Sequence, residues 1–122
     1  MSDNLTRSAL PHTVRTPAGT TVVTPSAEID LATAVPLTAL LDSLTCGPSP
    51  DVVLDLTAVS FIDCAGLGAL CRTRNRILAR AGRLRLVTGD CRFPRILRAA
   101  GLDGVFEVHP RLSGVLPSPV VI

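Results

Sequence analysis

The spacing of apolar residues changes from segment to segment along the chain, and this change predicts strands that alternate with helices. Four leucines recur at i, i+3, i+4 and i+7, which places them on one face of a helix: Leu37, Leu40, Leu41 and Leu44. They predict a helix over Thr33–Leu44, with Pro36 in its first turn, where the missing N–H costs little. The run Val52–Leu56 is almost continuously apolar, which is typical of a central buried strand.

The remaining apolar segments complete the order of elements. Further strands are predicted at His12–Thr16, Thr20–Pro25, Leu84–Val87 and Val105–Val108. Further helices are predicted from Asp63 to about Ala81 and near Phe93–Ala100. The order β-β-α-β-α-β-α-β predicts an α/β fold, with a mixed, mostly parallel β-sheet of about five strands and three to four helices packed on it.

Turn and cap residues mark the ends of these elements. Pro17-Ala18-Gly19 is a turn signal between the first two strands, and Gly47–Pro50 ends the first helix. Asp90 is placed to cap the third helix and Gly101 to stop it. Three regions are expected: a flexible N-terminal tail at 1–11, one domain at 12–112, and a C-terminal tail or short helix at 113–122.

Composition restricts the class of protein. The 122 residues suit one domain, and because 47% are hydrophobic, with no Trp, no Tyr and three Phe, its core must be aliphatic. Four cysteines occur without a CxxC spacing and only two histidines are present, so we expect free thiols, no metal site and no cofactor. The N-terminus lacks an apolar signal segment, and the apolar stretch Val52–Cys71 contains Asp55 and Asp63. We therefore expect a cytoplasmic protein without a membrane span.

Charge is divided unevenly along the chain. Residues 1–71 contain two arginines and seven acidic residues, whereas residues 72–122 contain ten arginines and three acidic residues. Arg72, Arg76 and Arg80 form an outer row on the second predicted helix. Such a block suits an acidic protein face, anionic lipid or nucleic acid, or is a solvated helix face. Nucleic acid is the weaker of these interpretations because no Tyr or Trp is present for base stacking.

The segment Asp55–Leu70 combines a strand end, a loop and the start of a helix. Asp63 can cap that helix, because its carboxylate can accept hydrogen bonds from free backbone N–H groups. Cys64–Ala65 then occupies the first turn, where the helix dipole favours negative charge. Gly66 and Gly68 keep the surface low, so that another chain can approach closely.

This segment resembles the signature of the STAS-domain family of anti-sigma-factor antagonists. The family pattern is an apolar strand followed by Phe-(Ile/Met)-Asp-Ser-(Ser/Ala)-Gly-Leu, and the chain reads Phe61-Ile62-Asp63-Cys64-Ala65-Gly66-Leu67. Upstream, Ala27–Ala34 is similar to the family's Gly-Glu-(Leu/Ile)-Asp segment before its first helix. Downstream, Arg98–Phe106 is similar to the family's third-helix exit, so the resemblance covers residues 12–112.

The resemblance implies a STAS-type fold and a partner-binding role without catalysis. Family members bind an anti-sigma factor, often a serine kinase of the histidine-kinase-like ATPase type, and so free a sigma factor for transcription. The kinase phosphorylates the Ser that follows the motif Asp, and the added charge breaks the complex. The implied partner-binding residues are Asp30, Asp55, Asp63, Cys64, Ala65, Gly66, Leu67 and Gly68. The free protein is expected to be a monomer, as family members often are.

Cys64 stands at the phosphoacceptor position and Ala65 follows it, so the chain departs from the family pattern at the switch. Neither side chain can carry a stable phosphoserine. Three interpretations stay open: a constitutive or otherwise regulated binder, a redox switch based on thiol oxidation, and an inert small residue in a protein with degraded function.

Other roles also stay open from the sequence. Asp30 can cap the first helix or lie at the partner-binding face, and Asp55 can hold the N–H groups of the next loop or meet the partner. An enzyme is disfavoured because no histidine lies near Cys64 in the motif to act as its base. A ligand-sensing STAS module is the remaining alternative, and a pocket under the motif loop would favour it.

Overall fold

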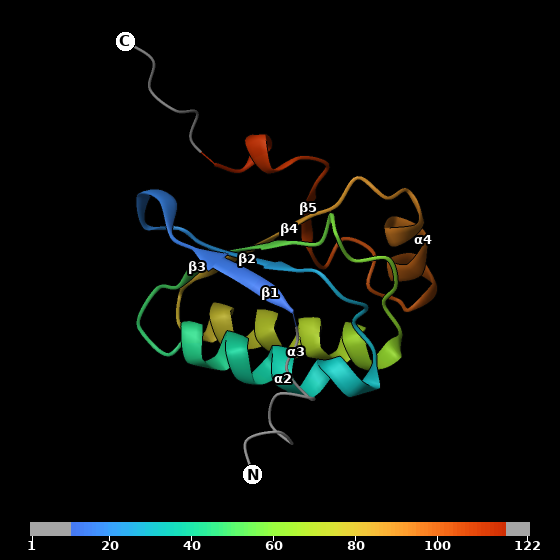
Figure 1. The fold of residues 1–122 in the computed structure, drawn as a ribbon, viewed down its shortest axis with the longest axis horizontal. Helices are drawn as coiled ribbons and strands as arrows, with labels where there is room; N and C mark the ends of the chain where they lie inside the picture. The colour runs from blue at the N-terminus through green and yellow to red at the C-terminus, as the bar shows by residue number, and fades with distance from the viewer. Residues whose placement is uncertain (1–10, 117–122) are drawn as a thin grey trace.

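The computed structural model describes residues 11–116, which form one sheet with helices packed on it (Figure 1). The strands are β1 (His12–Arg15), β2 (Thr21–Pro25), β3 (Asp51–Asp55), β4 (Arg83–Val87) and β5 (Glu107–His109). The helices are α2 (Leu31–Leu44), α3 (Cys64–Ala79) and α4 (Arg92–Ala99), with the 3-10 turns η1 (Pro17–Gly19) and η2 (Leu112–Gly114).

The five strands lie in the sheet in chain order. β1 and β2 form an antiparallel hairpin, whereas β2, β3, β4 and β5 pair in parallel. In the central register Val53 lies between Val22 of β2 and Arg85 of β4. Because parallel strands end at the same edge of a sheet, the segments that follow β2, β3 and β4 emerge together there. This is the edge where α/β proteins commonly place a site.

The core is aliphatic, as the composition predicts. Helices α2 and α3 lie side by side against one face of the sheet, and α4 lies farther along toward one end of the molecule (Figure 1). Side chains that are fully buried between these layers include Val23, Leu37, Leu41, Val52, Leu54, Leu70, Ile77 and Leu86. Helix α4 adds Phe93 and Leu97 to the same cluster. Each such side chain contributes about 1.5–3 kcal/mol by leaving water.

The opposite face of the sheet is covered by the chain that follows β5. A smaller apolar cluster lies there: Val22, Val53, Val87 and Val115. Arg85 is buried beside it, and its guanidinium pairs with Asp51 at 2.7 Å and donates to the carbonyl of Val115 at 2.8 Å. The segment predicted as a tail or short helix therefore begins with a 3-10 turn that packs on the sheet, and its residues 117–122 lie outside the described residues.

The predicted order of elements and the mixed, mostly parallel sheet are confirmed, and the differences lie at element ends. Helix α2 begins at Leu31, because Asp30 caps it, so Pro36 lies in the second turn and not in the first as predicted. The last strand begins at Glu107, two residues later than predicted, because Val105 closes a turn by donating to the carbonyl of Leu102 at 3.1 Å. Residues 1–10 of the predicted N-terminal tail lie outside the described residues.

Of the two predicted ends of α4, the stop at Gly101 is confirmed, whereas the cap is Cys91 and not Asp90 as predicted. Asp90 precedes the cap residue Cys91, and its carboxylate accepts a hydrogen bond from the N–H of Arg92 at 2.9 Å. At the other end Gly101 has a φ of 76°, and the N–H of Leu102 donates back to the carbonyl of Leu97 at 2.8 Å. This is the glycine-terminated helix end that the sequence suggests.

Candidate functional site

Helix α3 begins at the motif, and Asp63 is its N-cap as predicted. The Oδ1 atom of Asp63 accepts a hydrogen bond from the N–H of Gly66 at 3.0 Å, and its carbonyl accepts one from the N–H of Leu67 at 2.9 Å. Cys64–Ala65 forms the first turn, where backbone N–H groups have no partner within the helix. The dipole of α3 adds a partial positive charge at the same place.

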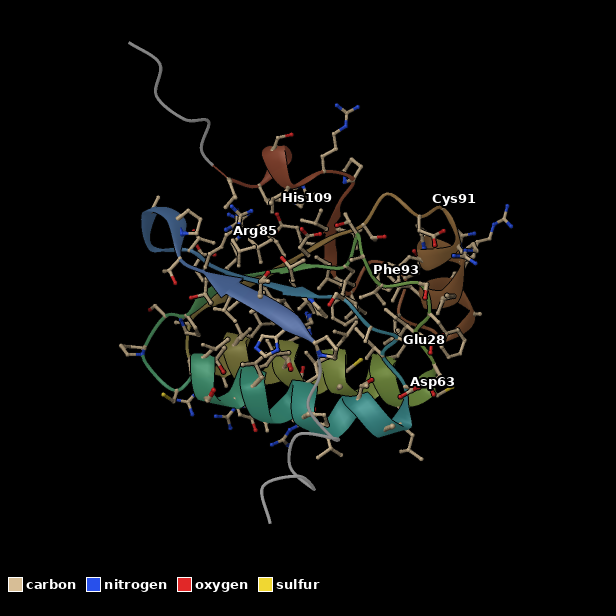
Figure 2. All side chains as sticks on the ribbon, viewed as in Figure 1. Glu28, Asp63, Arg85, Cys91, Phe93 and His109 are labelled. Atoms are coloured by element: carbon tan, nitrogen blue, oxygen red, sulfur yellow. The ribbon has the colours of Figure 1, made fainter. Side chains whose placement is uncertain are left out.

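A short backbone bridge ties the motif to the segment before α2. Ile29 and Ile62 pair as an isolated parallel bridge, in which the N–H of Ile29 donates to the carbonyl of Phe61 at 2.9 Å and the N–H of Asp63 donates to the carbonyl of Ile29 at 3.2 Å. Both isoleucine side chains are buried. The bridge brings the segment before α2 beside the start of α3, and Figure 2 shows Glu28 and Asp63 at the same end of the molecule.

Asp30 is the N-cap of α2, so of its two predicted roles the structure shows the capping role. Its Oδ1 accepts from the N–H groups of Ala32 and Thr33, at 3.0 and 3.1 Å. In return the hydroxyl of Thr33 accepts from the N–H of Asp30 at 3.0 Å, which completes a capping box. Helices α2 and α3 therefore begin side by side, each fixed by an aspartate.

The two glycines of the motif have different surroundings. Gly66 is buried, and a Cβ atom there would lie 2.6 Å from the carbonyl oxygen of Ile29 and 2.9 Å from a methyl group of Ile62. The chain that approaches Gly66 closely is thus this protein's own segment before α2. Gly68 is exposed, and a Cβ atom there would meet nothing within 4 Å. Gly68 is therefore the glycine at which an outside chain can approach α3.

The other motif residues divide into exposed and buried positions. Cys64 is exposed with a free thiol, Ala65 is half-buried, and Leu67 is buried in the core at 6% exposure. Asp55 is also buried, and its Oδ1 accepts from the N–H and the hydroxyl of Thr57, at 3.1 and 2.7 Å. Of the two roles predicted for Asp55 the structure shows that of holding the loop. Burial leaves Asp55 and Leu67 little surface for a partner.

An apolar patch beside the motif was not predicted from the sequence. The name covers three exposed apolar side chains on the two segments that the Ile29–Ile62 bridge joins: Leu31 and Val35 on α2 and Phe61 in the motif loop, with exposed fractions of 76%, 71% and 51%. Leu31 and Val35 are one helical turn apart and share a face of α2. The sequence did contain a signal for their exposure, because Leu31 and Val35 lie outside the leucine stripe that marks the inner face of the helix. Exposed apolar patches on an otherwise well-packed domain mark interaction surfaces.

A shallow groove of about 400 Å³ runs between α2 and α3 and continues this patch. Small side chains line it, including Ala34, Thr38 and Ala39 on α2 and Ala65, Gly68 and Ala69 on α3. At its far end Asp42 of α2 pairs with Arg72 at 3.1 Å and with Arg76 at 3.0 Å. Part of the predicted arginine row thus ties α3 to α2 instead of lying free in solvent.

A second hollow, here called the loop pocket, lies between the motif loop and α4 and has a volume of about 110 Å³. Its apolar wall is formed by Leu56, Val59, Phe61, Ile62, Phe93 and Ile96. Its polar edge is formed by Ser60, Thr88, Asp90 and Arg92. Hydrogen bonds from the guanidinium and the backbone N–H of Arg92 lower the pKa of Asp90 to about 2, so this edge carries a paired carboxylate and guanidinium.

Within residues 11–116 no three His, Cys, Asp or Glu side chains gather in a group that could hold a metal ion. His109 pairs with Glu107 at 2.8 Å, and Figure 2 shows it well separated from Asp63 at the motif. Among the helices of the described part, none is long and apolar enough to cross a membrane. The start of α3 exposes one small free thiol, that of Cys64.

Comparison with known proteins supplies the context for this surface. The family model described as STAS domain matches residues 12–114. The anti-sigma-F factor antagonist RsfA of Mycobacterium tuberculosis is 29% identical over 112 residues, which cover 89% of this chain and 87% of RsfA. A crystal structure of an anti-sigma factor antagonist from Mycobacterium paratuberculosis superposes with a TM-score of 0.74 at 29% identity, over 88% of this chain and 91% of that one. The anti-sigma factor antagonist SpoIIAA in its unphosphorylated form shares the fold, with a TM-score of 0.65 at 14% identity over 85% and 92% of the chains.

Proposed function

This chain belongs to the STAS domain family, and from that premise we propose that it is an anti-sigma-factor antagonist, which binds an anti-sigma factor and so frees a sigma factor for transcription. The two mycobacterial relatives at 29% identity are antagonists of this kind. The observation that carries the proposal is the exposed apolar patch of Leu31, Val35 and Phe61 beside the capped start of α3. Such a surface on a rigid frame is what a protein partner needs.

The partner we propose is an anti-sigma factor of the serine-kinase type, with the histidine-kinase-like ATPase fold, and the free protein is a monomer. The partner covers the first turn of α3 and the groove between α2 and α3. Cys64 and Gly68 are exposed there and small, so a partner backbone can approach closely. Contact at Cys64 places the partner's active centre where relatives of this family present a serine.

Cys64 removes the phosphorylation switch from this position. A phosphoserine would add about −1.5 to −2 charges to the surface that the partner covers, and a hydrated dianion is costly to bury. A thiol is close to a hydroxyl in size but does not form a stable phosphoserine, so the contact is kept and the charge is not added. We therefore propose a binder that the partner's kinase activity does not release through this residue.

A second candidate is redox control of the same surface. The Cys64 thiol is free and exposed at the N-terminus of α3, where a soluble oxidant can reach it. Oxidation to a sulfenic acid or a mixed disulfide would add bulk where the partner docks. The unmodified thiol, however, is already small enough for the close approach proposed above, and that contact requires no oxidant. The constitutive binder is thus the first candidate.

The test is a pull-down from lysate of the source organism with this protein as bait, in reducing buffer, with and without ATP and magnesium. We expect the wild type to capture an anti-sigma factor, identified by mass spectrometry, in both conditions. Cys64→Ser is the matched variant, because it restores the hydroxyl without changing shape, and we expect ATP to disperse its complex. Release of the wild type after mild peroxide treatment would favour the redox candidate. Capture of no anti-sigma factor under either condition would refute the proposed function.

A further inference from the structure

Resting on the proposed function, we infer that the partner-binding surface continues past the motif loop onto α4. There the loop pocket takes one apolar side chain of the partner, and Arg95 pairs with a carboxylate next to it. The partner is thereby specified as a protein that presents an apolar residue flanked by acidic residues. None of the partner-binding residues implied by the family signature lies on α4.

The size of the loop pocket favours a side chain over a cofactor. Its volume of about 110 Å³ lies below the roughly 150 Å³ of an engineered cavity that admits benzene. It is also far below the roughly 300–1,000 Å³ that is usual for small-molecule sites. Binding energy in protein interfaces is concentrated in a few anchor side chains that fill pockets of this kind.

The position of the loop pocket makes it continuous with the proposed interface. Phe61 belongs to both, since its side chain is 51% exposed in the apolar patch and also lines the pocket. Ile62, the next residue, lines the pocket and directly precedes the cap Asp63. The pocket wall therefore includes the two residues that lead directly into the start of α3.

Positive charge on α4 favours acidic residues in the partner, next to the apolar side chain that fills the loop pocket. Arg92 is already paired with Asp90, with 2.7 Å between its Nη2 and Oδ2 of Asp90. Arg95 is exposed and has no ion pair within residues 11–116. Three residues of α4 line the pocket: Arg92, Phe93 and Ile96. With about 100° per residue in a helix, Arg95 lies about 110° round the axis from the centre of these three, and Arg98 lies about 170° away on the far side of α4. Arg95 is thus the unpaired cation of α4 that lies nearer to the pocket.

The experiment is a titration of the nitrogen-15-labelled protein with blocked peptides, followed by backbone amide resonances in the NMR spectrum. The probe is Asp-Asp-Leu-Asp-Asp, and the controls are Asp-Asp-Ala-Asp-Asp, Lys-Lys-Leu-Lys-Lys and N-acetyl-leucinamide. At millimolar concentration we expect the acidic leucine peptide to shift residues 59–62 and 92–96 and each control to shift them much less. Equal shifts with the alanine peptide, shifts confined to other residues, or equal binding by N-acetyl-leucinamide would each overturn the inference.

Two variants sharpen the result. Arg95→Ala changes an exposed side chain, and we expect the peptide to bind about two- to fivefold more weakly, as for an exposed ion pair. Arg98→Ala removes the same charge from the far side of α4 and is expected to change affinity less. Equal effects of the two variants would overturn the role of Arg95.

If the pull-down captures an anti-sigma factor but no peptide binds, the proposed function stands and this inference fails. If peptides bind as expected but no anti-sigma factor is captured, the proposed function fails.

Discussion

At the residue scale, the proposed control of binding depends on the side chain that Cys64 places in the first turn of α3. That turn carries free backbone N–H groups and the positive end of the helix dipole, so a negative charge there is compatible with the fold of the free protein. The same charge is unfavourable once a partner covers it, because the partner would have to desolvate it. Folding and binding thus respond to charge at position 64 in opposite directions.

Cys64→Asp separates these two effects. We expect affinity for the captured anti-sigma factor to fall at least tenfold, about 1.4 kcal/mol, because a carboxylate is placed in the interface. Stability is expected to stay level or rise by about 0.3–1 kcal/mol, because the carboxylate lies at the helix N-terminus. Isothermal titration calorimetry and thermal unfolding measure the two quantities, with Cys64→Ala as the control that keeps binding. An Asp variant that binds as tightly as the wild type would show that the partner docks elsewhere.

The two motif glycines give a matched pair. Gly66→Ala is expected to lower the free energy of unfolding by about 1–3 kcal/mol, because its Cβ would lie 2.6 Å from the carbonyl oxygen of Ile29. Gly68→Ala is expected to raise it by about 1 kcal/mol, because open space surrounds the site and Ala favours the helix. Denaturant unfolding measures both changes.

Gly68→Ala is expected to affect binding and stability in opposite directions. Its added methyl group narrows the groove between α2 and α3, so we expect Gly68→Ala to weaken the anti-sigma factor complex while the domain itself becomes more stable. Isothermal titration calorimetry measures the affinity of the variant. Because the variant is more stable than the wild type, a loss of affinity cannot be caused by unfolding. Unchanged affinity would remove the groove from the proposed interface.

Pairs of elements are joined at the surface by arginine ion pairs. Asp42 joins α2 to α3 through Arg72 and Arg76, and Glu107 joins β5 to β4 through Arg83, with 2.6 Å between the nearest nitrogen and oxygen atoms. Hydrogen bonds from Arg83, with a smaller contribution from His109, lower the pKa of Glu107 from 4.5 to about 2. Much of the arginine block is therefore used within the domain.

The Glu107 pair predicts a dependence of stability on pH. Because the folded-state pKa lies below the unfolded value, the contribution of Glu107 is complete above pH 4.5 and is lost as the pH falls toward about 2. Glu107→Gln should therefore flatten the slope of unfolding free energy against pH in this window. Glu28→Gln, at an exposed residue without an ion pair in residues 11–116, is the control and should keep the slope. The effect is modest because the pair is partly in solvent.

Periodicity predicted the inner faces of the helices well, because burial imposes it directly on the sequence. The leucine stripe located α2, and Asp63 located the start of α3 through its capping chemistry. Contacts between distant segments leave no such period. The Ile29–Ile62 bridge and the pairing of Asp42 with two arginines on α3 depend on how loops and helices are placed by the whole sheet. The contacts that bring the segment before α2 to the start of α3 could therefore not be predicted from the sequence.

The site occupies one end of the whole molecule, where the segments that follow three parallel strands meet. The sheet face opposite α2 and α3 is covered by Val115, whose carbonyl accepts a hydrogen bond from the buried Arg85. The STAS fold and the motif were recognisable from sequence because they rest on local residue patterns. The apolar patch was not, because exposure of Leu31 and Val35 is a property of the assembled fold.

The central claim is that this protein binds an anti-sigma factor and that ATP does not release it. The most direct measurement is fluorescence anisotropy of a labelled sigma factor held by the purified anti-sigma factor, with magnesium and ATP present. The account predicts that the wild type displaces the sigma factor and that the displacement persists, whereas displacement by Cys64→Ser decays as the serine is phosphorylated. Failure of the wild type to displace the sigma factor, or decay at the same rate for both proteins, would contradict it.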